Sequence, residues 1–152
     1  MQMTETAPTS GALQSPDTAD RNVEASWQRV CRLDDIVPDT GVCALLGQAQ
    51  VAVFRVTLPE GAMTVDAQDA AIGEGQSGCQ EALFAIGNVD PHSGAAVLSR
   101  GVIGSLGERI VVASPLYKQH FDLRTGECVE SPAHAVPAYR VALKDGAVWL
   151  AA

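Results

Sequence analysis

The residues of this chain that most readily bind a transition metal are four cysteines and three histidines. The cysteines are irregularly spaced and include no Cys-x-x-Cys pair: Cys31, Cys43, Cys79 and Cys128. The nearest candidates for a shared site are Cys79, His92, His120 and Cys128, but their separations match no usual spacing of metal ligands. We therefore expect no new metal centre in this chain.

The same cysteines could instead form two disulfides, since their number is even. Residues 1–24 lack the apolar core of a secretory leader, and a chain without a leader stays in a reducing compartment. Reduced thiols that act as small apolar side chains are therefore the favoured interpretation. We expect a cytoplasmic protein.

Motifs of enzymatic catalysis are absent from the sequence. There is no Gly-x-Ser-x-Gly elbow, no His-Glu-x-x-His and no dinucleotide-binding fingerprint. The glycine-rich stretch Gly73–Gly78 lacks the lysine of a phosphate-binding loop. We expect no catalysis by this chain alone and no nicotinamide binding.

Composition narrows the class of partner. The 152 residues are 47% hydrophobic and 18% charged, which is typical of one folded domain, and the net charge is −8. Such an acidic chain offers no basic patch large enough to neutralise several phosphates, which argues against nucleic acid as a partner. No apolar run reaches the length of a membrane-spanning helix, so other proteins are the expected partners.

The chain divides into a tail and one domain. Residues 1–24 carry four acidic side chains against one basic one and show no helical or strand periodicity, so we expect a disordered acidic tail. Residues 25–152 alternate short apolar segments with turns, which is typical of an all-β sandwich or small barrel of antiparallel strands.

The expected elements are short. A single helical turn is predicted at Leu33–Ile36, and a hairpin at Val42–Leu46 and Val51–Leu58. Glu81–Ile86 and Ile110–Ala113 read as core strands. Near the C-terminus, Asp145-Gly146 predicts a tight turn between strands at 139–144 and 147–150. Asp66–Gly73 could form a short helix.

Two segments in the second half carry a family resemblance. They read Gly87-Asn-Val-Asp-Pro-His-Ser-Gly94 and Ser114-Pro-Leu-Tyr-Lys-Gln-His-Phe-Asp-Leu-Arg-Thr-Gly126. They resemble the two cluster-binding loops of Rieske iron–sulfur domains, Cys-x-His and Cys-Pro-x-His, the second followed by a Phe-Asp-x-x-Thr-Gly hairpin. In that family two cysteines hold one iron and two histidines hold the other.

Matching residue by residue, the resemblance implies four former ligand positions: Asp90, His92, Ser114 and Tyr117. Only His92 keeps a ligand side chain, and neither Asp90 nor Ser114 supplies the thiolate that one iron requires. The resemblance therefore implies a Rieske-like domain with its two loops and without its metal. His92 could be a leftover ligand or a redox-linked proton donor, but a partly solvated loop histidine that fills space is the favoured interpretation.

One branch of the family is closer than the rest. The strings at 85–91, 97–104 and 112–121 are similar to the small subunits of bacterial assimilatory NAD(P)H-dependent nitrite reductases. An aromatic residue is usual in this branch where His92 stands. The resemblance implies a non-catalytic subunit of an oxidoreductase that converts nitrite to ammonium, docked on a large subunit that holds siroheme, a [4Fe-4S] cluster, FAD and NAD(P)H. The alternatives are a Rieske-type [2Fe-2S] electron-transfer protein and a stand-alone β-sandwich interaction module.

The two loops are then the expected docking surface, because they match the family most closely. Its candidate residues are Asn88, Arg100, Tyr117, Lys118 and His120. This half of an acidic chain contains four basic residues: Arg100, Arg109, Lys118 and Arg124. Their charge suits an acidic partner surface. That they are ordinary solvated loop charges is an equally good interpretation. Without a metal, we expect hydrogen bonds among Asp90, Ser114 and Tyr117 to join the loops, with the tyrosine ring covering an apolar gap.

Overall fold

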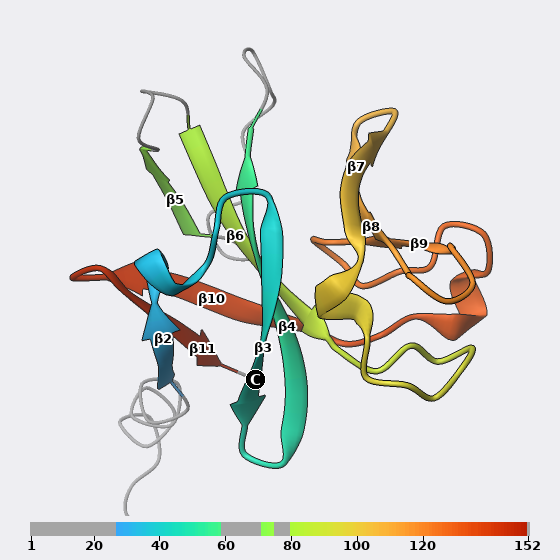
Figure 1. Ribbon diagram of the computed structural model, residues 1–152, viewed down its shortest axis with the longest axis horizontal. Coiled ribbons are helices and arrows are strands. Elements are labelled where there is room, and N and C mark those ends of the chain that lie inside the picture. Colours follow the sequence, from blue (N-terminus) through green and yellow to red (C-terminus); the bar gives the residue numbers. More distant parts are fainter. Residues whose placement is uncertain (1–26, 59–70, 75–79, 152) are drawn as a thin grey trace, which may run out of the picture.

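The chain folds as an all-β protein built on two antiparallel sheets (Figure 1), in a computed structural model that describes residues 27–58, 71–74 and 80–151. The larger sheet runs in the order β2-β11-β10-β6-β4-β3, with β5 paired to β6. Its strands are β2 (Gln28–Arg32), β3 (Thr40–Leu46), β4 (Ala49–Thr57), β5 (Ala71–Glu74), β6 (Gln80–Gly87), β10 (Ala138–Lys144) and β11 (Ala147–Ala151). The smaller sheet has three: β7 (Val102–Leu106), β8 (Arg109–Ala113) and β9 (His120–Asp122). The prediction of an all-β fold of short antiparallel strands is confirmed.

The larger sheet curls until its two end strands approach each other. The amide Nε2 of Gln28 on β2 donates to the carbonyl oxygen of Leu45 on β3 at 3.2 Å, so the sheet is a nearly closed barrel. The described residues also form three short 3-10 turns: η2 (Leu33–Asp35), η3 (Leu98–Arg100) and η4 (Pro132–His134). No helix among the described residues is long and apolar enough to span a membrane.

Most of the predicted elements are present. The turn at Leu33, the hairpin β3–β4 and the hairpin β10–β11 all occur, the last with Asp145 and Gly146 at φ of 54° and 76° as a two-residue turn requires. The prediction of a helix over Asp66–Gly73 is wrong at its end, because Ala71–Gly73 belong to β5; the rest of that segment lies outside the described residues. The predicted tail, residues 1–24, also lies outside them.

Two apolar cores share one wall formed by β4 and β6. Val51 and Val53 on β4 point into the barrel, where they pack with Ile36, Leu83 and residues of β10 and β11. The alternate β4 residues point out of the barrel, toward the small sheet. Both faces of β4 are therefore buried, which explains its nearly continuous apolar sequence.

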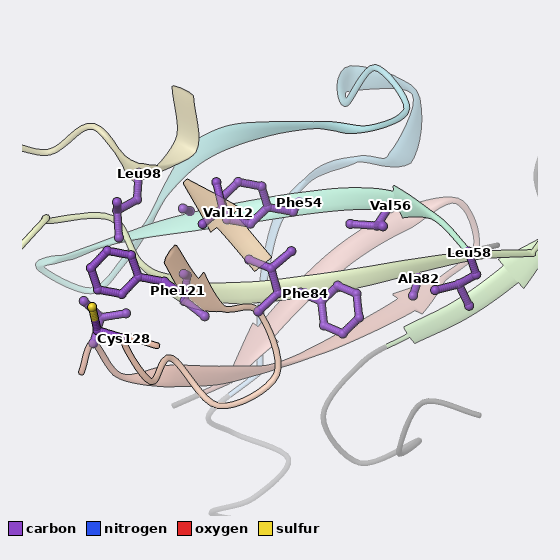
Figure 2. Close-up of a cluster of buried hydrophobic side chains, with 13 residues drawn as sticks. Phe54, Val56, Leu58, Ala82, Phe84, Leu98, Val112, Phe121 and Cys128 are labelled. Carbon is purple, nitrogen blue, oxygen red and sulfur yellow. The ribbon is translucent and has the colours of Figure 1, made fainter. Parts of the chain in front are cut away.

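The outer core joins the barrel to the small sheet (Figure 2). It contains all three phenylalanines of the chain, each fully buried: Phe54 from β4, Phe84 from β6 and Phe121 from β9. Cys128 packs in the same cluster as a small apolar side chain, as expected. This core holds the loops of the small sheet at a fixed place against the barrel.

A buried ion pair closes one end of the barrel. The Arg55 guanidinium contacts a carboxylate oxygen of Glu81 at 3.0 Å and donates to the carbonyl oxygen of Ile36 at 2.8 Å. The two charged residues are 5% and 7% exposed. The same arginine thus neutralises a buried carboxylate and fastens the chain just after η2.

Gly101 is required where the loop after η3 passes β8. A Cβ there would lie 2.6 Å from Cγ2 of Val112 and closer still to the carbonyl oxygen of Ala113, whereas a Cβ at Gly104 would meet nothing within 4 Å. We predict that Gly101→Ala lowers the free energy of unfolding by about 2–3 kcal/mol through overpacking, and that Gly104→Ala changes it by less than about 0.5 kcal/mol. Urea denaturation of the two variants measures this, and equal stability would contradict the close approach.

Candidate functional site

The candidate site is the pair of loops at the tip of the small sheet. The first loop (residues 88–100) connects β6 to β7, and the second loop (residues 114–119) connects β8 to β9. The first loop is a tight turn: the backbone N–H of Asp90 donates to the carbonyl oxygen of Ala95 at 2.8 Å, and Gly94 adopts φ of 77°. The second is tighter, since Lys118 takes φ of 62° and its N–H donates to the Ser114 carbonyl oxygen at 2.9 Å.

A side-chain hydrogen bond joins the two loops. The Ser114 hydroxyl donates to Oδ2 of Asp90 at 2.5 Å, and the two residues are 1% and 0% exposed. The other carboxylate oxygen, Oδ1, accepts from the backbone N–H of His92 at 2.8 Å. We call this contact the Asp90–Ser114 link. It directly connects two of the four positions that the resemblance matches to cluster ligands.

The carboxylate of Asp90 is held in its charged form. Burial alone would raise its pKa, but hydrogen bonds from the Ser114 hydroxyl and from the backbone and ring of His92 outweigh burial. The net effect places the pKa of Asp90 below its ordinary value. The link is therefore charge-assisted at neutral pH, which makes it stronger than a bond between neutral groups.

His92 lies among aromatic side chains beside this link. Its ring stacks on His134 with centroids 4.6 Å apart and meets Phe121 edge-on at 6.1 Å. Its Nδ1 is 3.3 Å from Oδ1 of Asp90, its side chain is 14% exposed, and its Nε2 has no partner among the described residues. His92 is thus partly exposed, and it fills space between the loops.

Two expectations for these residues are wrong. Tyr117 does not cover the gap between the loops, because it is 61% exposed and points to solvent; the His92 and His134 rings lie there instead. Asn88 offers no docking surface, because it is 2% exposed. Its Oδ1 accepts from the backbone N–H of Ser99 at 2.7 Å, so it fastens the end of the first loop to its beginning.

The other candidate surface residues divide into free and paired ones. Arg100 and Lys118 are exposed. His120 is partly exposed, and its backbone N–H donates to Glu130 at 2.8 Å while its Nδ1 lies 2.6 Å from the same carboxylate. These hydrogen bonds lower the pKa of Glu130 despite partial desolvation. Arg109 is bound to Glu127 at 2.8 Å, so its charge is already matched.

His134 is the one site residue that sequence reasoning missed. It comes from η4, beyond the family motifs, and Nδ1 of its ring lies 2.7 Å from the Ser131 hydroxyl. Nothing in the spacing of the chain connects it to His92, because the contact depends on how the segment after Cys128 folds back over the loop.

A [2Fe-2S] cluster does not fit the side chains at the four positions that the resemblance matches to Rieske ligands. A Rieske centre requires two thiolates and two imidazoles, and the positions supply a carboxylate, an imidazole, a hydroxyl and an exposed phenol. The two positions that would hold the sulfurs are hydrogen-bonded to each other. Among the described residues, no group of three or more histidine, cysteine or acidic side chains could hold a metal ion.

The comparisons with known proteins place this fold and site in a class. A family model described as Rieske-like [2Fe-2S] domain matches residues 26–77 and 60–151. The nitrite reductase (NADH) small subunit of Escherichia coli K12 is 40% identical over 126 residues, which are 83% of this chain and 97% of that protein. The solution structure of the nitrite reductase [NAD(P)H] small subunit from Erwinia carotovora has 40% identity and a TM-score of 0.58, over 84% of this chain and 82% of that one.

A much longer protein contains a related segment. The nitrite reductase [NAD(P)H] large subunit of Klebsiella oxytoca is 35% identical to this chain over 124 residues, which are 82% of this chain and 11% of that protein. The chain belongs to the Rieske-like domain family and, within it, to the small subunits of NADH-dependent nitrite reductase.

The Asp90–Ser114 link should be measurable in the stability of the protein. We predict that Ser114→Ala lowers the free energy of unfolding at pH 7 by about 1.5–3 kcal/mol, because it leaves a buried carboxylate without its hydroxyl partner. The exposed Ser105→Ala on β7 is the control and should change the value by less than about 0.5 kcal/mol. Urea denaturation gives both numbers, and equal stability of the two variants would show that the link contributes nothing.

The effect should also depend on pH. Because the pKa of Asp90 is lowered in the folded state, its contribution is complete above the unfolded pKa and disappears as the pH falls through the folded one. The stability difference between the native chain and Ser114→Ala should therefore shrink in acid. Repeating the denaturation at decreasing pH tests this, and a constant difference would exclude an ionised Asp90 as the acceptor.

Proposed function

We propose that this protein is a cluster-free accessory subunit of a cytoplasmic NAD(P)H-dependent nitrite reductase, which reduces nitrite to ammonium. The large subunit then carries the siroheme, the [4Fe-4S] cluster, the FAD and the NAD(P)H site, and this chain performs no chemistry of its own. The observation that carries the proposal is the Asp90–Ser114 link, at 2.5 Å, between the two positions that the resemblance matches to the cluster cysteines.

The link supports a structural role for the loops. In a cluster-bearing domain, metal–ligand bonds hold two loops together. Here a charge-assisted hydrogen bond between buried groups takes over that task, and backbone hydrogen bonds such as Asp90 N–H to the Ala95 carbonyl and Lys118 N–H to the Ser114 carbonyl keep each loop a tight turn. A rigid pair of loops is a suitable docking element because little conformational entropy is lost when it binds.

The outer surface of the loops has the composition of a docking site. Three apolar side chains are well exposed there, Val89 at 42%, Leu116 at 50% and Tyr117 at 61%, and the exposed cations Arg100 and Lys118 belong to the same two loops. Aromatic and arginine side chains are enriched at the energetic centres of protein interfaces. We assign the loop face formed by these residues to the large subunit.

The relative from Klebsiella oxytoca supports the choice of partner. A segment similar to this chain forms part of a nitrite reductase large subunit there. A module that is covalently joined to the large subunit in one organism is well suited to associate with it non-covalently in another.

A Rieske-type electron-transfer protein is the second candidate. It is favoured by one observation, the retained His92 in a former ligand position, close to a second histidine, His134. It requires sulfur ligands that neither loop supplies.

Iron content separates the two candidates. We predict that protein purified without air is colourless and contains no stoichiometric iron or acid-labile sulfide, because the loops provide no thiolate. Visible absorption together with iron analysis measures this. A brown protein with stoichiometric iron and sulfide would overturn the cluster-free proposal and make His92 the first residue to replace.

Docking is tested on the loop face itself. We predict that Leu116→Ala/Tyr117→Ala and Arg100→Glu/Lys118→Glu each weaken binding of the large subunit by roughly 10- to 100-fold, because they remove apolar contacts or reverse charge at the interface. Val102→Ala, which alters a 74%-exposed side chain on β7, is the control and should bind normally.

Titration of the purified large subunit, followed by calorimetry, measures the affinities. All variants should keep the melting temperature of the native chain, because the substituted side chains are exposed. Native affinity in both double variants would show that the loop face is not the docking surface.

A further inference from the structure

A second surface lies on the outside of the barrel, on the strands β2, β10 and β11. On β10, Val141 and Leu143 pack inside the barrel, so Arg140, Ala142 and Lys144 project from the opposite face. A hollow of about 570 Å³ opens there, and the described residues that line it are Trp27, Ala142, Lys144 and Trp149. We call it the tryptophan hollow.

The tryptophan hollow is basic on an otherwise acidic protein. The Arg140 guanidinium lies 5.2 Å from the centroid of the Trp27 ring, and Arg29, the cross-strand neighbour of Trp149, is exposed beside it. Lys144 lines the hollow itself, so three of the ten basic residues of a chain of net charge −8 belong to the strands β2 and β10 at this surface. An acidic segment of polypeptide is the chemistry that such a surface fits.

One of the residues that line the hollow carries an unpaired donor. The indole Nε1 of Trp149 is buried and has no acceptor among the residues that the structure describes. A buried N–H without an acceptor is unfavourable, and carboxylates and backbone carbonyls of a bound segment are acceptors. The hollow therefore has the characteristics of a surface that something else covers.

The chain itself carries an acidic segment directly before Trp27 in the sequence. Asp17, Asp20 and Glu24 precede Trp27, which lines the hollow, and the segment 1–24 has four acidic side chains against one basic one. Asp20 and Glu24 are within roughly 10–25 Å of Trp27 along an extended chain. Such a short tether gives an effective concentration on the order of millimolar, which makes weak contacts sufficient.

This segment lies outside the part that the chain shares with its relatives. The family match begins at residue 26, and the region shared with the Escherichia coli small subunit already covers 97% of that protein. We propose that the N-terminal acidic segment, around Asp17–Glu24, binds over the tryptophan hollow of its own chain. It shields the two indoles and the basic side chains from other acidic partners.

Intrinsic fluorescence reports on this hollow alone, because Trp27 and Trp149 are the only tryptophans of the chain. In the full chain, Asp20→Asn/Glu24→Gln should release the segment. Acrylamide should then quench the tryptophan fluorescence of this variant about twofold more strongly than that of the native chain. Acrylamide is uncharged, so its local concentration does not depend on the charges that the substitutions remove. In the native chain, 0.5 M NaCl should raise quenching to the same extent, because it screens the attraction between the segment and the hollow.

The matched control is Asp34→Asn/Glu108→Gln, which neutralises two exposed acidic residues elsewhere. Acrylamide should quench its tryptophan fluorescence as weakly as that of the native chain. Arg140→Glu/Lys144→Glu should raise quenching as Asp20→Asn/Glu24→Gln does. Combining it with Asp20→Lys/Glu24→Lys restores opposite charges and should restore protection.

Native quenching in Asp20→Asn/Glu24→Gln overturns the proposal. So does a failure of the charge-swapped chain to recover protection while the melting temperatures stay equal. Protection that falls on dilution would assign the hollow to a second copy of the chain. Protection that arises only when the large subunit is added would assign it to that subunit. Either result also excludes the N-terminal segment as the occupant, and neither depends on how the loop face docks.

Discussion

The fold depends on the two-sided burial of the wall formed by β4 and β6. One face of this wall is the inside of the barrel, and the other is the floor under the small sheet. Because both faces are largely apolar and buried, the barrel and the small sheet cannot move independently without exposing phenylalanine side chains to water. The loops at the tip are rigid for the same reason: β6 leads directly into the first loop, and Phe121 of the outer core follows the second.

The apolar cores fix the position of the two loops, and polar groups determine the local shape of the loops. Asn88 fastens the first loop to itself, and the Asp90–Ser114 link fastens the loops to each other. Buried polar groups of this kind are favourable only when all of them are bonded. The Asp90 carboxylate makes both connections, because it accepts a hydrogen bond from Ser114 of the other loop and one from His92 of its own loop. Binding surfaces for other proteins then need only the exposed residues outside this network.

The sequence was informative where local chemistry decides the structure. Apolar alternation and the Asp145-Gly146 turn are enough to place β10 and β11. The match of Asp90, His92, Ser114 and Tyr117 to cluster ligands rests on the family resemblance and stays a prediction. The sequence did not predict features that depend on contacts between residues far apart in the chain. The directions of Tyr117 and Asn88 depend on which face of a loop meets the core, and β7, with a glycine at its centre, lacks the apolar alternation of a buried strand. The contact between His92 and His134 could not be read from either segment alone.

The pairing of β2 with β11 brings the two ends of the described domain together at one edge of the sheet. Figure 1 shows both strands on the far side of the barrel from the small sheet. A chain that enters at β2 and leaves at β11 can therefore be spliced into a longer polypeptide while its tip remains free. This geometry makes the same module equally usable as a separate gene product or as a segment of a large enzyme, as the relative from Klebsiella oxytoca illustrates.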